Sequence, residues 1–249
     1  MFKRTNGLYF PWSFKQCLSY FAYMIYGLTY NIFVIFYLPP NVKYIFYPAF
    51  NLLLLTSLCL HLTTAYTNPA DPHIYSPLSI NSEFPIIHRC SICKSPIQLF
   101  SKHCTSCNKC IYKYDHHCFW VNNCIGGKNY KIFFAMVISN TLLAFTTSIS
   151  CIIVLENTIL LSEDLDDNIK ITFIFFIVFS GSFSLLATLY FTYILIFHMY
   201  MCYLGLTTYE YLIKKRNRTA VLPSHRVQDW ERSESANTCQ NNIRIFELN

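Results

Sequence analysis

The chain has 249 residues, of which 53% are hydrophobic and 13% are charged. A soluble domain carries about 25% charged residues, so this chain has too few charges to coat a globular surface. Membrane-spanning runs explain the shortage. The net charge of +6 fits the excess of Lys and Arg that cytosolic loops carry. Because we find no basic stripe interleaved with exposed aromatic residues, we expect no nucleic acid partner.

Four apolar segments are long enough to cross a bilayer, which needs about 20 residues. The first, 18–38, and the second, 45–66, are separated by a turn so short that they must form a tight helical hairpin. The third is 132–155. The fourth, 171–204, would be about 51 Å long as one helix. That is too long for one upright crossing and too short for two, so we expect one tilted helix. The sequence therefore predicts an all-α membrane protein with four transmembrane helices.

Polar residues inside these spans have two interpretations. His61 and His198 are ionisable groups within the membrane, which often mark functional sites. Each also lies near the expected cytosolic end of its span, so an interfacial position explains them equally well. The hydroxyl and amide residues of the third span are typical of contacts between helices. These residues are Asn140, Thr141, Thr146, Thr147, Ser148 and Ser150.

The loops predict how the chain crosses the membrane. Basic residues concentrate before the first span, between the second and third, and after the fourth, whereas the loop 156–170 is acidic. The positive-inside rule therefore places both termini and the central loop in the cytosol. The predicted organisation is a cytosolic N-terminus (1–17), a transmembrane hairpin (18–66), a cytosolic cysteine-rich domain (67–131), two further spans (132–204) and a cytosolic tail (205–249).

The central loop contains a dense cluster of cysteines and histidines. Zinc prefers four tetrahedral Cys or His ligands, and Cys-x2-Cys pairs commonly supply two of them. Two closed zinc sites would use eight of the ten candidates and leave two over. A spare His beside a spare Cys suits nucleophilic catalysis, and the run 115–118 is the natural place to look. The candidates are Cys90, Cys93, His103, Cys104, Cys107, Cys110, His116, His117, Cys118 and Cys124.

A longer motif surrounds this run. It reads Asp115-His116-His117-Cys118, Trp120-Val121, Asn123-Cys124-Ile125-Gly126, Asn129 and Phe133. Residues 90–133 closely resemble the cysteine-rich domain of the DHHC-type protein S-acyltransferases, the palmitoyltransferases. The four-span layout extends this resemblance to most of the chain. Weaker similarities are Asp71-Pro72 after the second span and Thr207-Thr208-Tyr209-Glu210 after the fourth.

The resemblance implies a role for each member of the cluster. Cys118 would be the nucleophile, His116 the base that accepts its proton, and Asp115 the carboxylate that orients His116. The substrates would be a fatty acyl-CoA, such as palmitoyl-CoA, and cysteine thiols of membrane-associated proteins. One structural zinc would be held by Cys90, Cys93, His103 and Cys110, and the other by Cys104, Cys107, His117 and Cys124.

Basic residues near the membrane ends are candidates for binding the phosphates of CoA. They are Lys128, Lys131, Lys214, Lys215 and Arg216. Ordinary positive-inside charge explains each of them equally well. The motif after the fourth span suggests a bond between Thr208 and Asp115, and a structural role for Glu210.

The sequence departs from the family pattern at a few positions. Phe119 stands where Pro is usual, and Gly205 replaces a frequent Asn. Asn242 and Phe246 are faint candidates for the family's tail motif. Two other functions compete: a membrane adaptor whose zinc module only binds partners, and a metal sensor or transporter. The family's common setting predicts an endomembrane location, in the endoplasmic reticulum or Golgi, with the plasma membrane as the alternative.

Overall fold

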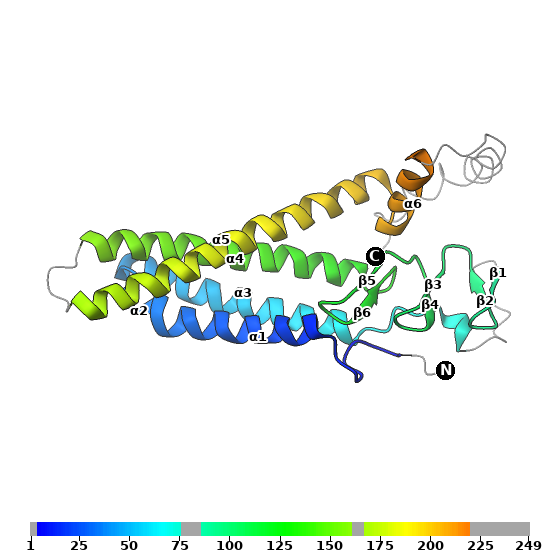
Figure 1. The fold of residues 1–249 in the computed structure, drawn as a ribbon, viewed down its shortest axis with the longest axis horizontal. Coiled ribbons are helices and arrows are strands. Elements are labelled where there is room, and N and C mark those ends of the chain that lie inside the picture. Colours follow the sequence, from blue (N-terminus) through cyan, green and yellow to red (C-terminus); the bar gives the residue numbers. More distant parts are fainter. Residues whose placement is uncertain (1–3, 76–85, 161–166, 220–249) are drawn as a thin grey trace. The chain divides into compact units, whose positions relative to one another are not determined.

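The computed structural model describes residues 4–75, 86–160 and 167–219. The chain forms two compact units, Met1–His198 and Met199–Asn249, and we describe each by itself. The described part of the chain is mostly helical and contains four helical stretches long and apolar enough to cross a membrane (Figure 1). The predicted fold class, an all-α membrane protein with four spans, is therefore confirmed.

The helices agree with the predicted spans, but the first three begin a few residues earlier than expected. The first span is a composite of two α-helices joined by one π-helical turn. The candidate spans are Phe14–Tyr37, Pro40–Tyr66, Tyr130–Asn157 and Ile171–Leu204. The elements that contain them are α1 (Phe14–Thr29), the π-helix η1 (Tyr30–Val34), α2 (Ile35–Tyr37), α3 (Pro40–Tyr66), α4 (Tyr130–Leu160) and α5 (Asp167–Leu204).

Local capping explains the early starts of the first two spans. The hydroxyl of Ser13 accepts a hydrogen bond from the backbone N–H of Gln16 at 3.0 Å, so α1 begins directly after Ser13. Such a cap satisfies one of the donors left free at a helix start. Pro40 occupies the first turn of α3, where its fixed φ suits a helix and its missing N–H is not needed.

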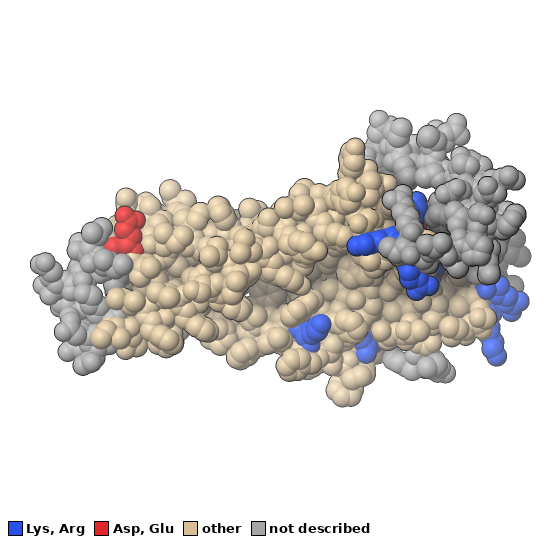
Figure 2. All heavy atoms as spheres, turned by 45° about the horizontal axis from the view of Figure 1, so that its top comes forward, with Lys and Arg blue, Asp and Glu red and all other residues tan. Residues whose placement is uncertain are grey.

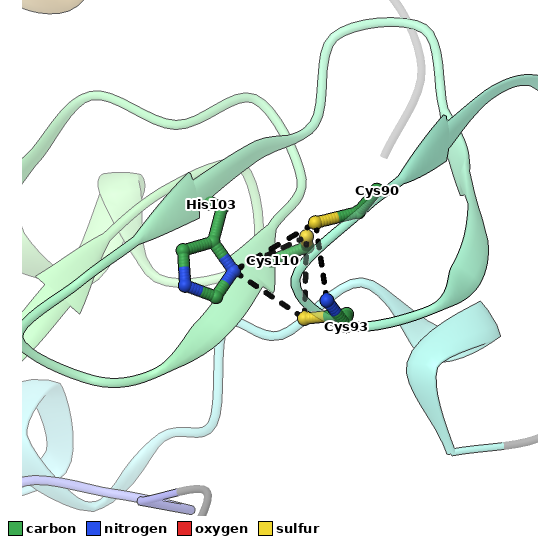
Figure 3. Close-up of side chains that lie close together, drawn as sticks. All are labelled: Cys90, Cys93, His103 and Cys110. Atoms are coloured by element: carbon green, nitrogen blue, oxygen red, sulfur yellow. Dashed lines mark hydrogen bonds between the residues drawn. The ribbon is translucent and has the colours of Figure 1, made fainter.

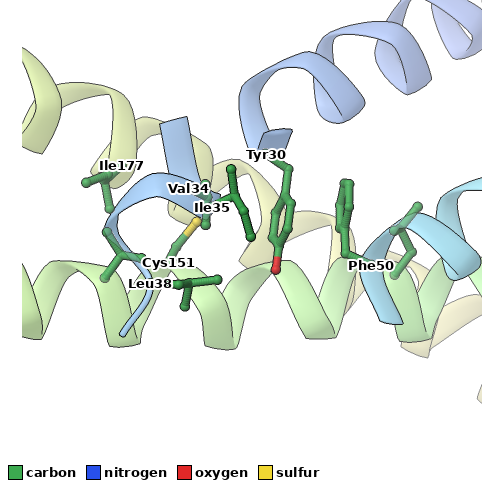
Figure 4. Packing of buried hydrophobic residues seen from close by; sticks show 9 residues of the cluster. Tyr30, Val34, Ile35, Leu38, Phe50, Cys151 and Ile177 are labelled. Carbon is green, nitrogen blue, oxygen red and sulfur yellow. The ribbon is translucent and has the colours of Figure 1, made fainter. Parts of the chain in front are cut away.

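The membrane helices pack around a core in the first unit. The ring of Tyr30 stacks on that of Phe50 with centroids 3.6 Å apart, and Cys151 and Ile177 belong to the same cluster (Figure 4). The hydroxyl of Tyr30 lies 2.9 Å from that of Ser150 on α4. A hydroxyl that is buried among apolar groups needs such a partner.

The expected contacts of polar residues between helices are confirmed for several members of the third span. Asn140 accepts a hydrogen bond from the hydroxyl of Tyr23 at 2.8 Å. The hydroxyl of Ser148 lies 3.3 Å from that of Thr188 on α5. These bonds join helices where lipid could offer no polar partner.

The cysteine-rich segment between α3 and α4 consists of three small antiparallel hairpins (Figure 1). The all-α expectation did not anticipate them. A short 3-10 turn, η2 (Pro72–Ile74), precedes them. The hairpins are β1 (Ile86–Cys90) with β2 (Ser95–Gln98), β3 (Lys102–Cys104) with β4 (Lys109–Ile111), and β5 (His116–Cys118) with β6 (Asn123–Ile125).

The second unit contains the end of α5 and helix α6 (Thr208–Thr219). Gly205, with φ of 64°, ends α5, and the N–H of Leu206 donates to the carbonyl of Met201 at 3.1 Å. A residue in this left-handed conformation at a helix end is usually Gly and sometimes Asn. Glu210 accepts from the N–H of Thr207 at 2.8 Å, and Thr207 caps Glu210 in return. This capping box gives Glu210 the structural role that we expected.

Candidate active site and metal centres

The three hairpins repeat one turn. In each, a cysteine ends the first strand and the fourth residue after it has a positive φ: 54° at Lys94, 51° at Asn108 and 52° at Asn122. Cys90, Cys104 and Cys118 therefore occupy equivalent positions. Such a left-handed residue lets a short chain reverse its direction. Cys118 therefore has the same turn geometry that positions the sulfur atoms of Cys90 and Cys104.

The first cluster brings together Cys90, Cys93, His103 and Cys110 (Figure 3). The Nδ1 atom of His103 lies 3.3 Å from the sulfur of Cys93 and 3.9 Å from those of Cys90 and Cys110. Because Zn–S bonds are about 2.3 Å and Zn–N bonds about 2.0–2.1 Å, tetrahedral ligands lie about 3.5–3.8 Å apart. The spacing fits one zinc ion.

The second cluster has the same composition. The Nδ1 atom of His117 lies 3.4 Å from the sulfur of Cys107, 3.6 Å from that of Cys124 and 3.8 Å from that of Cys104. In both clusters the histidine faces a cysteine across a hairpin, His103 opposite Cys110 in one and His117 opposite Cys124 in the other. These two groups of three cysteines and one histidine could each bind zinc.

The first strand of the third hairpin presents His117 on one face, and His116 and Cys118 on the other. Successive side chains of a strand point to opposite faces. Since His117 faces the second cluster, its neighbours His116 and Cys118 face away from it. Val121 stands where the other two hairpins have the second cysteine of a Cys-x2-Cys pair. Cys118 therefore lacks the nearby partner thiol that its equivalents have.

Asp115 and His116 are directly hydrogen-bonded. The Nδ1 atom of His116 lies 2.6 Å from Oδ2 of Asp115, whose side chain is buried. The backbone N–H of Asp115 donates to the carbonyl of Ile125, which fixes the carboxylate on the hairpin. A carboxylate in this position selects the tautomer of the imidazole and stabilises its protonated form.

The protonation of His116 and Cys118 follows from these contacts. Burial lowers the pKa of His116, but hydrogen bonds with Asp115 and Cys118 outweigh it and raise that pKa to about 9. Burial raises the pKa of Cys118, but the hydrogen bond to His116 and the charge of its ring outweigh it and lower that pKa. Both shifts favour a thiolate beside an imidazolium, the reactive form of a cysteine nucleophile.

Apolar side chains from three membrane helices surround Cys118. It belongs to one cluster with Ala65 at the end of α3, Phe133 and Met136 on α4, and, at its edge, Leu195 on α5. Only 7% of Cys118 is exposed. The thiol therefore lies where the hairpins meet the membrane helices, in surroundings suited to a hydrocarbon chain.

His198 lies beside Asp115 and His116, a placement that the sequence left open. A nitrogen of His198 lies within 4.8 Å of ligand atoms of Asp115 and His116. The hydroxyl of Tyr130 is 3.2 Å from Nδ1 of His198 and restrains its ring. The sequence shows a histidine within the fourth span, but it is too far along the chain from Asp115 and His116 for their proximity to be predicted.

Other motif residues fasten the hairpins to the membrane helices. The side-chain amide of Asn123 donates to the backbone carbonyls of Thr64, Ala65 and Thr67 at the end of α3, at 2.7–3.1 Å. These carbonyls lack helical partners because the helix ends there. The single amide of Asn123 thus joins the end of α3 to the third hairpin.

Asp71 has a similar structural role at the first hairpin. Its buried carboxylate accepts hydrogen bonds from the N–H groups of His73 and Gln98, each at 2.9 Å, and from the hydroxyl of Ser101. Burial raises the pKa of Asp71, but these bonds outweigh it and lower the pKa. A carboxylate satisfied in this way stays charged and holds the strand in place.

The candidate CoA-binding residues divide between the two units. Lys128 and Lys131 are exposed near the start of α4. The others lie on α6 in the second unit. Thr208 belongs to the second unit as well, and its proposed bond to Asp115 stays a prediction. Asn242 and Phe246 lie outside the described residues. The candidates on α6 are Lys214, Lys215 and Arg216.

The described residues thus combine four long apolar helices with two Cys3His clusters and a buried thiol beside an imidazole, as a membrane-embedded thiol enzyme would need. A comparison with protein families matches residues 83–215, more than half of the chain, to the family described as DHHC palmitoyltransferase. The chain belongs to the DHHC palmitoyltransferase family, which implies protein S-acyltransferase activity. A comparison with curated proteins found no match.

Proposed function

We propose that Cys118 is the nucleophile of this S-acyltransferase, with His116 as its base and Asp115 as the orienting carboxylate. The observation that carries the proposal is the third hairpin. One strand directs His117 toward the zinc cluster and places His116, bonded to Asp115 at 2.6 Å, on the same face as Cys118. A scaffold that only bound zinc would have no need of this aligned pair.

The first half of the reaction would acylate the enzyme. His116 takes the proton of Cys118, and the thiolate attacks the thioester carbonyl of a long-chain acyl-CoA. The bond from the carbonyl carbon to the CoA sulfur breaks as the bond to Cys118 forms. The departing CoA thiolate recovers the proton from His116. Such covalent catalysis splits one transfer into two steps.

The second half would transfer the acyl group to a substrate protein. His116 accepts the proton of a cysteine thiol of that protein, whose sulfur attacks the acyl–Cys118 thioester. The new thioester forms as the bond to Cys118 breaks, which leaves the Cys118 thiolate beside the protonated His116. Each cycle regenerates the enzyme and leaves no net proton to dispose of.

The two Cys3His clusters would hold structural zinc. Four protein ligands at tetrahedral spacing leave no open position for water or substrate, which is typical of structural sites. Bound zinc would fix the hairpins and so the position of Cys118. The acyl chain would lie among the membrane helices beside Cys118, because exposing it to water costs about 0.8 kcal/mol per CH2. The five basic residues proposed for the CoA phosphates stay candidates.

We propose the topology that the sequence predicts, with both termini, the cysteine-rich domain and the tail in the cytosol. The backbone N–H of Arg4 donates to the carbonyl of Cys107, which supports a common side for the N-terminus and the cysteine-rich domain. In the first unit, Lys and Arg side chains are visible on the surface in Figure 2. Most of the acidic loop and of the tail lies outside the described residues. An endomembrane location stays part of the proposal.

Incubating the purified protein with labelled palmitoyl-CoA tests the proposal. We expect label bound through a hydroxylamine-sensitive thioester in the native protein and in Cys17→Ser, whose thiol is exposed and outside the hairpins. Cys118→Ser should take up no label while retaining two zinc ions. A native protein that retains both zincs but never binds label would favour the adaptor function instead.

A further inference from the structure

A run of exposed aromatic side chains precedes the first span and has no role in the chemistry described above. This aromatic loop comprises residues 9–14. Phe10 and Phe14 are each 81% exposed, and Trp12 is 62% exposed. Contiguous apolar surface of this kind marks an interaction site in most proteins. Because the loop adjoins a helix long enough to span a membrane, the bilayer is the nearest apolar medium.

The backbone of the aromatic loop is held by hydrogen bonds, so its side chains are displayed in a defined way. The indole N–H of Trp12 donates to the carbonyl of Leu8 at 3.0 Å. The carbonyl of Pro11 accepts from the guanidinium of Arg4 at 3.1 Å and from the side-chain amide of Asn122 at 3.3 Å. These bonds satisfy polar groups that could not enter an apolar layer unpaired.

The chemistry of the loop fits the layer of lipid headgroups rather than the hydrocarbon core. Trp and Tyr concentrate at this boundary, where a ring can contact acyl chains while its polar atom stays hydrated. Exposed Lys15 follows the loop directly, with its ammonium 5.7 Å from the ring of Phe119 and 5.8 Å from that of Trp120. In the headgroup layer, the ammonium of Lys15 would contact the phosphate groups of lipids.

The aromatic loop is also joined to the segment that follows Cys118, the active-site loop (residues 119–122). The hydroxyl of Ser13 donates to the carbonyl of Phe119, and the hydroxyl of Ser19 donates to the carbonyl of Trp120 at 3.3 Å. The contact is close: a Cβ atom on Gly7 would lie 2.2 Å from the carbonyl oxygen of Val121. A movement of the N-terminal segment must therefore move the active-site loop.

We propose that the aromatic loop lies in the headgroup layer, on the membrane face that carries the cysteine-rich segment, and so sets the depth of Cys118 in the bilayer. A palmitoyl chain inserted among the helices fixes its thioester at one height. A thiol held at that height meets the carbonyl, and a misplacement of 1 Å can cost about 10²-fold in rate. The effect on rate rests on the proposed role of Cys118, whereas the contact with lipid does not.

Tryptophan fluorescence tests the contact with lipid. The full-length protein would be placed in vesicles of phosphatidylcholine brominated near the headgroup, and the emission of Trp12 taken as the difference between the native protein and Trp12→Phe. We expect brominated lipid to quench this difference signal and aqueous iodide to leave it largely unchanged. Quenching by iodide with no effect of brominated lipid would overturn the proposal.

Acylation rates test the coupling to Cys118. In vesicles, a Phe10→Ser, Trp12→Ser variant should be acylated by palmitoyl-CoA about tenfold more slowly than the native protein, with two zincs retained and unchanged alkylation of Cys118 by iodoacetamide. The matched control is Tyr44→Ser, which removes an 82% exposed ring near the start of α3, away from the hairpins. It should keep the native rate.

Native acylation in the double variant would refute the coupling. Slower acylation in both variants would refute it as well, because the effect would then belong to any exposed ring at the membrane boundary. If the native protein is not acylated while brominated lipid still quenches Trp12, the proposed nucleophile fails and the lipid contact stands.

Discussion

Cys118 differs from its two equivalents in the hairpin repeat through its neighbours. Cys90 and Cys104 each have a second cysteine three residues later, whereas Cys118 has Val121. With no second thiol at that position, Cys118 stays out of the metal clusters. The thiol of Cys118 is therefore available to His116. The hydrogen bond between them and the charge of the imidazole lower the pKa of Cys118.

Removing the imidazole should slow acylation without dismantling the hairpins. General acid–base catalysis by a placed side chain contributes about 10²–10⁴-fold, so we expect a loss of that order in His116→Ala. Single-turnover labelling with palmitoyl-CoA measures it. Since His116 is in neither Cys3His cluster, the variant should retain two zincs. A variant that loses zinc, or one that keeps the native rate, would contradict this role.

The pH dependence of alkylation should report the charged pair. Because the pKa of Cys118 is lowered and that of His116 is raised to about 9, the thiolate–imidazolium pair persists between these values. Alkylation of Cys118 by iodoacetamide should therefore rise at lower pH than that of an ordinary thiol, whose pKa is about 8.5. Asp115→Asn should move the rise back toward the ordinary thiol. A native profile that coincides with that of an ordinary thiol would be inconsistent with the pair.

At the scale of single elements, the third hairpin depends on its link to α3. Asn123 donates to three backbone carbonyls at the end of that helix, at 2.7–3.1 Å. In Asn123→Ala these carbonyls lose a buried donor, which costs about 1–3 kcal/mol. We expect a lower midpoint of thermal unfolding, measured with zinc present. Asn6→Ala removes an amide whose oxygen caps an exposed turn, and it should change the midpoint much less.

All three hairpins contribute ligands to the two Cys3His clusters, so we expect bound zinc to stabilise all three. A structural zinc supplies folding free energy to a small domain with few strands. Cys107→Ala should therefore reduce the zinc content from two ions to one and lower the yield of folded protein. Cys17→Ser, outside both clusters, should retain both ions. Metal analysis of the purified proteins decides this, and two zincs in Cys107→Ala would contradict the assignment of the second cluster.

The sequence predicted the elements whose signals are local. Length and hydropathy located all four spans. The Cys-x2-Cys spacing predicted two zinc sites, and the resemblance to the DHHC family implied which residues form each of them. The sequence did not predict the π-helical turn that begins at Tyr30, whose ring stacks on Phe50 and whose hydroxyl bonds that of Ser150, because contacts between helices leave no local sequence pattern. The place of His198 was left open for the same reason, since its partner Tyr130 belongs to another helix.

At the scale of the whole molecule, the proposed topology places the acidic loop on the opposite side of the membrane from the tail. The tail contains the acceptor sequence Asn217-Arg218-Thr219, which stays without glycan if it faces the cytosol. A sequon on a Gly–Ser insertion after Asp164 should be glycosylated when the protein is expressed in cells with an endoplasmic reticulum. Sensitivity of the protein to an endoglycosidase measures glycosylation at both sites. A glycan at Asn217 would reverse the topology.

The proposed mechanism depends most on the identity of the acylated thiol. Mass spectrometry of the intact protein after brief exposure to palmitoyl-CoA tests it directly. We predict that the native protein gains one palmitoyl group, that hydroxylamine removes it, and that Cys118→Ser with two zincs gains none. An equal gain in Cys118→Ser would place the intermediate on another cysteine and contradict the proposed mechanism.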